Sequence, residues 1–268
     1  MLTKLFAYLC RFPVLKRLLW RRWYQFLARR FAIPEWQTMN YGFSALPVAE
    51  PIALDLAEEG ERYGLQLYHA VCAGHSLAQK HVLEVGCGRG GGAAFLHRSG
   101  EPVAMTALDF SAEAIALCRK RYTRDGLTFL TGDAEKLPFA DATFDIVVNV
   151  ESSHCYGSMP AFLSEVRRVL KPNGRFLCAD FRDHDKVQSW REQLAASGLK
   201  VIVETELTAN VLAALDADND RKLALMRKIL PPRLFGAFSD FAAVKGSLVY
   251  EHFRSGEMRY FRFELLKE

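Results

Sequence analysis

Short apolar segments alternate with helical ones along the middle of the chain, from about residue 82 to residue 180. Short apolar runs bounded by glycine or polar residues are typical of buried strands, and helical spacing of apolar residues between them indicates covering helices. Strands that alternate with helices pair in parallel through right-handed crossovers, which predicts a doubly wound α/β domain. The predicted strands are 82–85, 103–108, 127–131, Phe144–Val150 and Arg175–Asp180, followed by Val201–Glu206 and Met258–Lys267.

Helical spacing of apolar residues predicts the segments around these strands. Helices are expected over 54–72, from the glycine cluster to about residue 98, from Ser111, from about Met159, and over 185–198. Helical spacing over 208–230 is broken at Pro231, and three phenylalanines at helical spacing then follow, Phe235, Phe238 and Phe241. We therefore predict a helical lid over about 208–245 on a domain that spans residues 51–268.

The N-terminal segment, residues 1–50, differs from the rest of the chain in charge. Eight basic residues and no acidic residue precede Glu35, although the net charge of the whole chain is only +4. Apolar residues recur at helical spacing over 2–31, and Pro13 is expected to kink or divide that helix. A basic helix with interleaved aromatics can contact a membrane interface, or it can pack on the body and cover the ligand site. Both interpretations remain open, and the acidic balance of the body argues against a nucleic-acid partner.

Six scattered cysteines without a CxxC pair indicate a reducing, cytoplasmic compartment, with neither a disulfide framework nor a metal site. Arginines interrupt the apolar runs at the N-terminus, so these runs predict neither a secretory signal nor a spanning helix. A mitochondrial presequence stays open, because the segment is rich in arginine and free of acids. If residues 1–31 contact lipid, the protein lies at the inner face of a membrane.

The first predicted strand runs into a glycine cluster, in the sequence HVLEVGCGRGGG from His81 to Gly92. Glycines between a strand and a helix expose backbone N–H groups to a ligand, and ligands bind at the carboxyl ends of such strands. Asp109 and Phe110 follow the second strand, where an acid can bind a ribose diol and an aromatic ring can stack on a base. Asp133 and Ala134 follow the third. A nicotinamide dinucleotide would use the same features, so these residues alone leave a dehydrogenase open.

The order of five motifs resembles the class I S-adenosylmethionine-dependent methyltransferases. The motifs are EVGCGRG at 84–90, LDFS at 108–111, GDAEKLPF at 132–139, FDIV at 144–147 and EVRRVLKPNG at 165–174. The resemblance implies a mostly parallel, seven-stranded, Rossmann-like sheet and S-adenosyl-L-methionine as the cofactor. It implies cofactor contacts for Glu84, Gly86, Cys87, Gly88, Asp109, Phe110, Asp133, Ala134 and Asn149.

A narrower resemblance covers WQTMNYGF at 36–43, NVESSHCY at 149–156, and Asp180 to Arg182. These segments are similar to methyltransferases of lipids and polyketides, such as the phthiotriol dimycocerosate O-methyltransferases and the sterol side-chain methyltransferases. The similarity implies that Tyr41 helps to close the cofactor site. Because this group includes both O- and C-methylating enzymes, an acceptor hydroxyl on a lipophilic small molecule, a lipid, polyketide or related natural product, is our hypothesis.

A hydroxyl acceptor benefits from a base that removes its proton as the new bond forms. His154 is the first candidate, because it follows the fourth strand. Glu151 is expected either to orient the imidazole or to be the base itself, and Asp180 is a third candidate. Phe235, Phe238 and Phe241 are predicted to line the acceptor pocket.

Two other functions remain alternatives at this stage. C-methylation of an isoprenoid, sterol or quinone would use acidic and aromatic side chains to stabilise a developing cation. A non-catalytic cofactor-binding partner protein would retain the glycine loop without turnover. The sequence makes no prediction of the oligomeric state.

Overall fold

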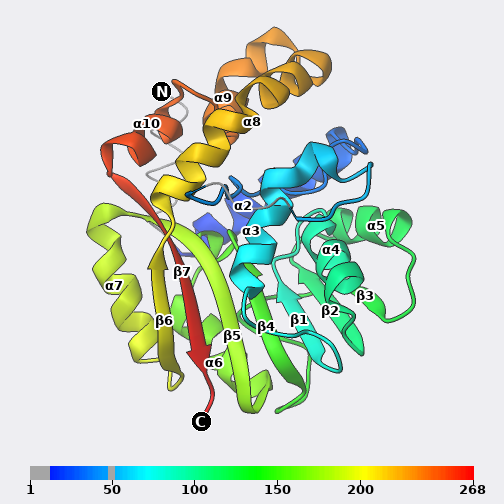
Figure 1. Ribbon diagram of the computed structural model, residues 1–268, viewed down its shortest axis with the longest axis vertical. Helices are drawn as coiled ribbons and strands as arrows, with labels where there is room; N and C mark the ends of the chain where they lie inside the picture. Colours follow the sequence, from blue (N-terminus) through cyan, green and yellow to red (C-terminus); the bar gives the residue numbers. More distant parts are fainter. Residues whose placement is uncertain (1–12, 48–51) are drawn as a thin grey trace.

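In the computed structural model, which describes residues 13–47 and 52–268, seven strands form one mostly parallel sheet (Figure 1). The order across the sheet is β3-β2-β1-β4-β5-β7-β6, and β7 pairs antiparallel with both of its neighbours. The strands are β1 (His81–Val85), β2 (Ala104–Asp109), β3 (Leu127–Thr131), β4 (Phe144–Val150), β5 (Leu170–Asp183), β6 (Lys200–Glu206) and β7 (Met258–Leu266). The predicted α/β fold with seven strands is confirmed.

Helices cover both faces of the sheet, because its central strands are apolar on both sides. On one face pack α3 (Arg62–Cys72), α4 (Gly91–Gly100) and α5 (Ala112–Arg121). On the other pack α6 (Met159–Val169) and α7 (His184–Ala195). Ser111 caps α5 as predicted, since its Oγ accepts from the Ala114 N–H at 3.2 Å.

Four further helices gather near the carboxyl ends of the parallel strands (Figure 1). They are α2 (Pro13–Arg30), α8 (Thr208–Ile229), α9 (Phe235–Phe241) and α10 (Leu248–Ser255). Short 3₁₀ turns lie at Glu59–Glu61, Ser153–Cys155 and Pro232–Leu234. The helices expected over 208–230 and at the three phenylalanines are present as α8 and α9. The prediction for residues 2–12 lies outside the described residues.

The structure departs from the predicted elements at three places. The helix expected from residue 54 begins at Arg62, because the Glu58 carboxylate accepts from the Asp55 N–H and holds a separate turn. The turn expected at Lys171–Gly174 lies within β5, where Asn173 and Gly174 exchange backbone hydrogen bonds with Lys267. Helix α10 was not predicted, although Ser247 caps it and Gly256 ends it.

Candidate cofactor and acceptor site

A cavity opens at the carboxyl ends of β1, β2 and β4, where the glycine loop meets helix α2. Seven of the expected cofactor residues line it: Gly86, Cys87, Gly88, Asp109, Phe110, Asp133 and Ala134. Glu84 and Asn149 are fully buried next to it, at the ends of β1 and β4. Tyr41 lines an adjoining cavity instead.

The backbone conformation of the glycine loop disfavours residues with a side chain. Gly86 has φ +81°, and a Cβ there would lie 2.3 Å from Ser152 Oγ. The Gly88 N–H donates to Asp109 Oδ2 at 2.9 Å, and the Ser111 N–H donates to Asp109 Oδ1 at 2.8 Å. Burial raises the pKa of Asp109, although both N–H groups oppose that rise by stabilising the carboxylate. The carboxylate is therefore fixed at the end of β2, where a ribose is expected.

Two buried oxygens near Gly86 lack hydrogen-bond partners among residues 13–47 and 52–268. Tyr68 donates to Glu84 Oε1 at 2.7 Å, which leaves Glu84 Oε2 unpaired, and Asn149 Oδ1 is also unpaired. Burial raises the pKa of Glu84 to about 7, with the Tyr68 hydrogen bond acting against it. Because an unpaired buried acceptor costs free energy, these atoms fit the ammonium group of an amino acid. The residues present therefore fit S-adenosylmethionine at this end of the cavity.

The other end of the cavity presents a ring and an acid, as expected for a base. The Phe110 ring lines it, with the Arg21 guanidinium 4.6 Å from the ring centroid. Asp133 Oδ1 accepts from the Glu135 N–H at 3.0 Å, which fixes the turn after β3. Phe110 and Asp133 thus both line the cavity, and their expected roles in adenine stacking and in recognition of its amino group stay predictions.

Helix α2 forms a wall of this cavity. The sequence indicated that this helix could cover the ligand site, but not which of its residues would do so. Trp20, Arg21 and Tyr24 line the cavity. The buried Arg89 donates to the carbonyls of Phe31 and Leu27, at 2.9 and 3.2 Å, at the end of the helix. Of the two interpretations of the N-terminal segment, packing on the body is thus observed for α2.

Arg89 lies within the glycine loop. The pattern of glycines in that loop did not predict that Arg89 would hold the end of α2. Its guanidinium also lies 3.9 Å from the centroid of the Trp36 ring. Because it donates to the last turn of α2 and stacks on Trp36, Arg89 ties both segments to the cofactor loop.

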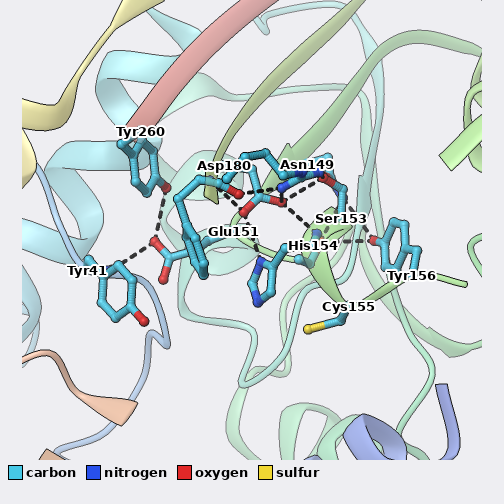
Figure 2. Close-up of polar contacts among 12 residues, drawn as sticks. Tyr41, Asn149, Glu151, Ser153, His154, Cys155, Tyr156, Asp180 and Tyr260 are labelled. Carbon is cyan, nitrogen blue, oxygen red and sulfur yellow. Dashed lines mark hydrogen bonds and ion pairs between the residues drawn. The ribbon is translucent and has the colours of Figure 1, made fainter. Parts of the chain in front are cut away.

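Glu151 is the acidic residue on the cavity wall just after β4 (Figure 2). Its φ of +48° is rare for a residue other than glycine, and such strain concentrates at functional sites. Glu151 Oε2 accepts from the Tyr41 N–H at 2.9 Å and from the Tyr260 hydroxyl at 3.0 Å, whereas no hydrogen bond to Oε1 is found within the described part of the chain. Burial raises the pKa of Glu151 to about 8, although these hydrogen bonds and His154 counteract it.

His154 is oriented by Asp180 and not by Glu151, which corrects one of the two expected roles of Glu151. Figure 2 shows the pair, in which His154 Nδ1 and Asp180 Oδ1 are 2.9 Å apart. The ring packs at a tilt of 33° against Phe181, and Trp20 meets it edge-on. Burial lowers the pKa of His154, but Cys155 and Asp180 outweigh burial and raise it to about 10. His154 and Arg182 in turn hold the pKa of Asp180 low against burial.

A second cavity lies between α8, α9 and the segment 36–41. Thr38, Met39 and Asn40 line both cavities, so this segment separates them. Phe238 and Phe241 line the second cavity as expected for an acceptor pocket. Phe235 instead packs in an apolar cluster between α2 and α9.

The chain resembles known methyltransferases in sequence and fold. A family profile described as a methyltransferase domain matches residues 83–178. The phthiotriol/phenolphthiotriol dimycocerosates methyltransferase of Mycobacterium leprae is 37% identical over 251 residues, which cover 93% of this chain and 92% of that protein. The fatty-acid O-methyltransferase of Mycolicibacterium smegmatis is 36% identical over 239 residues, covering 88% and 85%.

Solved structures support the fold. The crystal structure of the [4+2]-cyclase SpnF superposes with a TM-score of 0.68 at 18% identity, covering 92% of this chain and 94% of that one. The geranyl diphosphate C-methyltransferase of Streptomyces coelicolor, in complex with S-adenosyl-L-homocysteine, gives 0.65 at 17% identity, covering 91% and 98%.

Proposed function

Because the chain belongs to the methyltransferase family of the phthiotriol/phenolphthiotriol dimycocerosates methyltransferases, we propose that it methylates a hydroxyl on a lipophilic small molecule. The enzyme is an S-adenosylmethionine-dependent methyltransferase. The acceptor that we propose is a lipid, polyketide or related natural product. The names of the two relatives, one acting on phthiotriols and one on fatty acids, support this class.

One observation carries the proposal, namely that an apolar cavity adjoins the cofactor cavity across the segment 38–40. Met226, Phe238 and Phe241 give the second cavity its apolar wall. A lipophilic acceptor bound there would release ordered water from apolar surface, which favours binding. Tyr41 lines the second cavity and donates its backbone N–H to Glu151, so a carboxylate lies close to both spaces.

S-adenosylmethionine supplies a methyl group on a positively charged sulfur, already activated for displacement. The protein's main task is then alignment, which can contribute roughly 7–11 kcal/mol to lowering a barrier. We assign the amino-acid end of the cofactor to Glu84 and Asn149, the ribose to Asp109, and the base to Phe110 and Asp133. We assign closure of the cofactor site to the N-terminal segment, with Tyr41 beside the segment 38–40 that separates the two cavities.

We assign the acceptor proton to Glu151 Oε1. A carboxyl with a pKa of about 8 is a useful base in its carboxylate form, and the positive charge of His154 already lowers that pKa against burial. His154 has a pKa raised to about 10, so at neutral pH it is an imidazolium that accepts no proton. Asp180 positions that imidazolium.

Incubation with a deuterated methyl donor and a lipid extract of the host tests this function, with mass spectrometry of the products. The expected product carries the labelled methyl on oxygen, as shown by fragmentation. A label on carbon would replace the proposal with C-methylation. Cofactor binding without a labelled product in any extract would favour the non-catalytic partner protein.

We propose further that the outer face of α2 contacts anionic lipid at the cytoplasmic face of a membrane. Arg22, Arg30 and Phe26 are exposed on that face, which suits an interfacial helix. Among the described residues, no helix combines the length and the apolar character that crossing a bilayer requires. Contact with the surface is therefore the form of membrane association proposed.

A further inference from the structure

Lys222 of α8 brings a positive charge into the second cavity. Its Nζ donates to the Ala242 carbonyl at 3.3 Å, the one hydrogen bond found for this group among the described residues. An ammonium group has three donors, so two of them are left for another acceptor. Burial lowers the pKa of Lys222, as expected for a charge held away from water.

The acidic groups near Lys222 are already engaged by other donors. Arg221 Nε and Nη2 each lie 2.6 Å from an oxygen of Asp218. The Glu61 carboxylate accepts from the backbone N–H groups of Gln37 and Thr38, at 3.1 and 3.0 Å, and from the Thr38 hydroxyl. Among the described residues, Lys222 is thus the cation of this wall that keeps unused hydrogen-bond donors.

The rest of the second cavity is mainly apolar, with Leu225, Ile229 and Phe241 on its walls. Because Asp218 pairs with Arg221, Lys222 is the cation with donors left for a ligand, and a cation on a mainly apolar wall matches an amphiphile with an anionic head group. Glu151 also raises the pKa of Lys222, which places the two groups within electrostatic reach of each other. Tyr41 connects the second cavity with Glu151, because Tyr41 lines that cavity and donates its backbone N–H to the Glu151 carboxylate.

We propose that the acceptor is a hydroxylated lipophilic carboxylic acid, whose carboxylate pairs with Lys222 while its hydroxyl faces Glu151. This inference rests on the proposed function and narrows its acceptor class. In the transfer, the acceptor oxygen would bond to the methyl group as the bond from that methyl to the sulfonium sulfur breaks, which leaves S-adenosylhomocysteine. The hydroxyl proton passes to Glu151, and the carboxylate serves recognition alone. A buried charge pair of this kind gives specificity against uncharged analogues.

Steady-state kinetics with three matched acceptors test the inference: a long-chain hydroxy acid, its methyl ester, and the alcohol of equal length without the acid. The wild-type enzyme should show a KM for the acid about tenfold or more below that for the ester. In Lys222→Met the KM for the acid should rise to that for the ester, and Lys222→Arg should restore part of the preference. Lys228→Met is the control, since Lys228 is exposed on the same helix and pairs with Glu35.

Equal KM values for acid and ester in the wild-type enzyme would overturn the inference and leave the proposed function standing. So would an undiminished preference for the acid in Lys222→Met. Calorimetric binding of the same acid, in the presence of S-adenosylhomocysteine, distinguishes failure of this inference from failure of the proposed function. Binding that depends on Lys222, without methyl transfer to any of the three acceptors, would support the site and contradict the proposed hydroxyl methylation.

Discussion

At the scale of single residues, we expect replacement of the strained Glu151 to cause the largest loss of catalytic rate. Replacement of a positioned base costs typically about 10²–10⁴-fold in rate, so Glu151→Gln should lower kcat by that order. Glutamine keeps the acceptor oxygen that Tyr41 and Tyr260 contact, so affinity for S-adenosylhomocysteine should remain close to wild type. Stopped assays with calorimetry measure both quantities.

The pH dependence of Glu151→Gln tests more specifically whether Glu151 is the base. Glu151 must be deprotonated to accept a proton, and its pKa is raised to about 8, so the free enzyme's kcat/KM should rise with pH through that value. Glu151→Gln should lose this rise, whereas Glu251→Gln on the surface of α10 should keep it. An unchanged rate and profile in Glu151→Gln would remove Glu151 from the chemistry.

The His154–Asp180 pair makes a separate prediction that needs no substrate. The pKa of His154 is raised to about 10 by Cys155 and Asp180 against the effect of burial, so its ring should stay protonated from about pH 5 to 8. NMR of the histidine rings, assigned with His154→Gln, measures this directly. Asp180→Asn should lower the pKa of His154, because it removes one negative neighbour. Titration near pH 6.5 in the wild-type protein would contradict the proposed imidazolium.

At the scale of elements, the buried Arg89 side chain attaches the end of α2 to the cofactor loop. Arg89→Met removes the hydrogen bonds to the carbonyls of Phe31 and Leu27 and should lower the free energy of unfolding by about 1.5–3 kcal/mol. It should also weaken binding of S-adenosylhomocysteine, because Trp20 and Tyr24 of α2 line the cavity. Denaturant unfolding and calorimetry test this, with the exposed Arg22→Met as control. Wild-type affinity in Arg89→Met would show that α2 is dispensable for the cofactor.

The outer face of the same helix makes an independent prediction about membranes. The double variant Arg22→Glu, Arg30→Glu reverses two exposed charges and should reduce co-sedimentation with anionic liposomes. Binding of the wild-type protein should weaken as salt rises, because the attraction is electrostatic. Equal, salt-insensitive partitioning of both proteins would end the membrane proposal.

At the scale of the whole molecule, the sequence predicted what local patterns determine. The apolar runs of β1 and β4 and the Ser111 cap of α5 are local signals, and the structure matches them. The insertion of β7 between β5 and β6 is a choice among tertiary pairings, so no local period encodes it. The cofactor loop could likewise be predicted from the sequence, because its glycines and the acids at the strand ends occur in a fixed order.

The remaining site residues become visible only when distant segments meet. Tyr260 lies on β7, 109 residues from the Glu151 carboxylate that it contacts. Lys222 looks like any helical lysine until α9 and the segment 36–41 enclose it. Asp180, rather than the nearby Glu151, holds His154 because β5 lies beside β4 in the sheet.

The most direct test of the central claim is a crystal structure with S-adenosylhomocysteine and a hydroxylated lipid acceptor. We predict the amino-acid end of the cofactor product beside Glu84 and Asn149, and its base against Phe110. The acceptor hydroxyl should lie within hydrogen-bonding distance of Glu151 Oε1, with the apolar chain between α8 and α9. A cofactor product bound elsewhere, or an acceptor whose hydroxyl lies away from Glu151, would contradict this account.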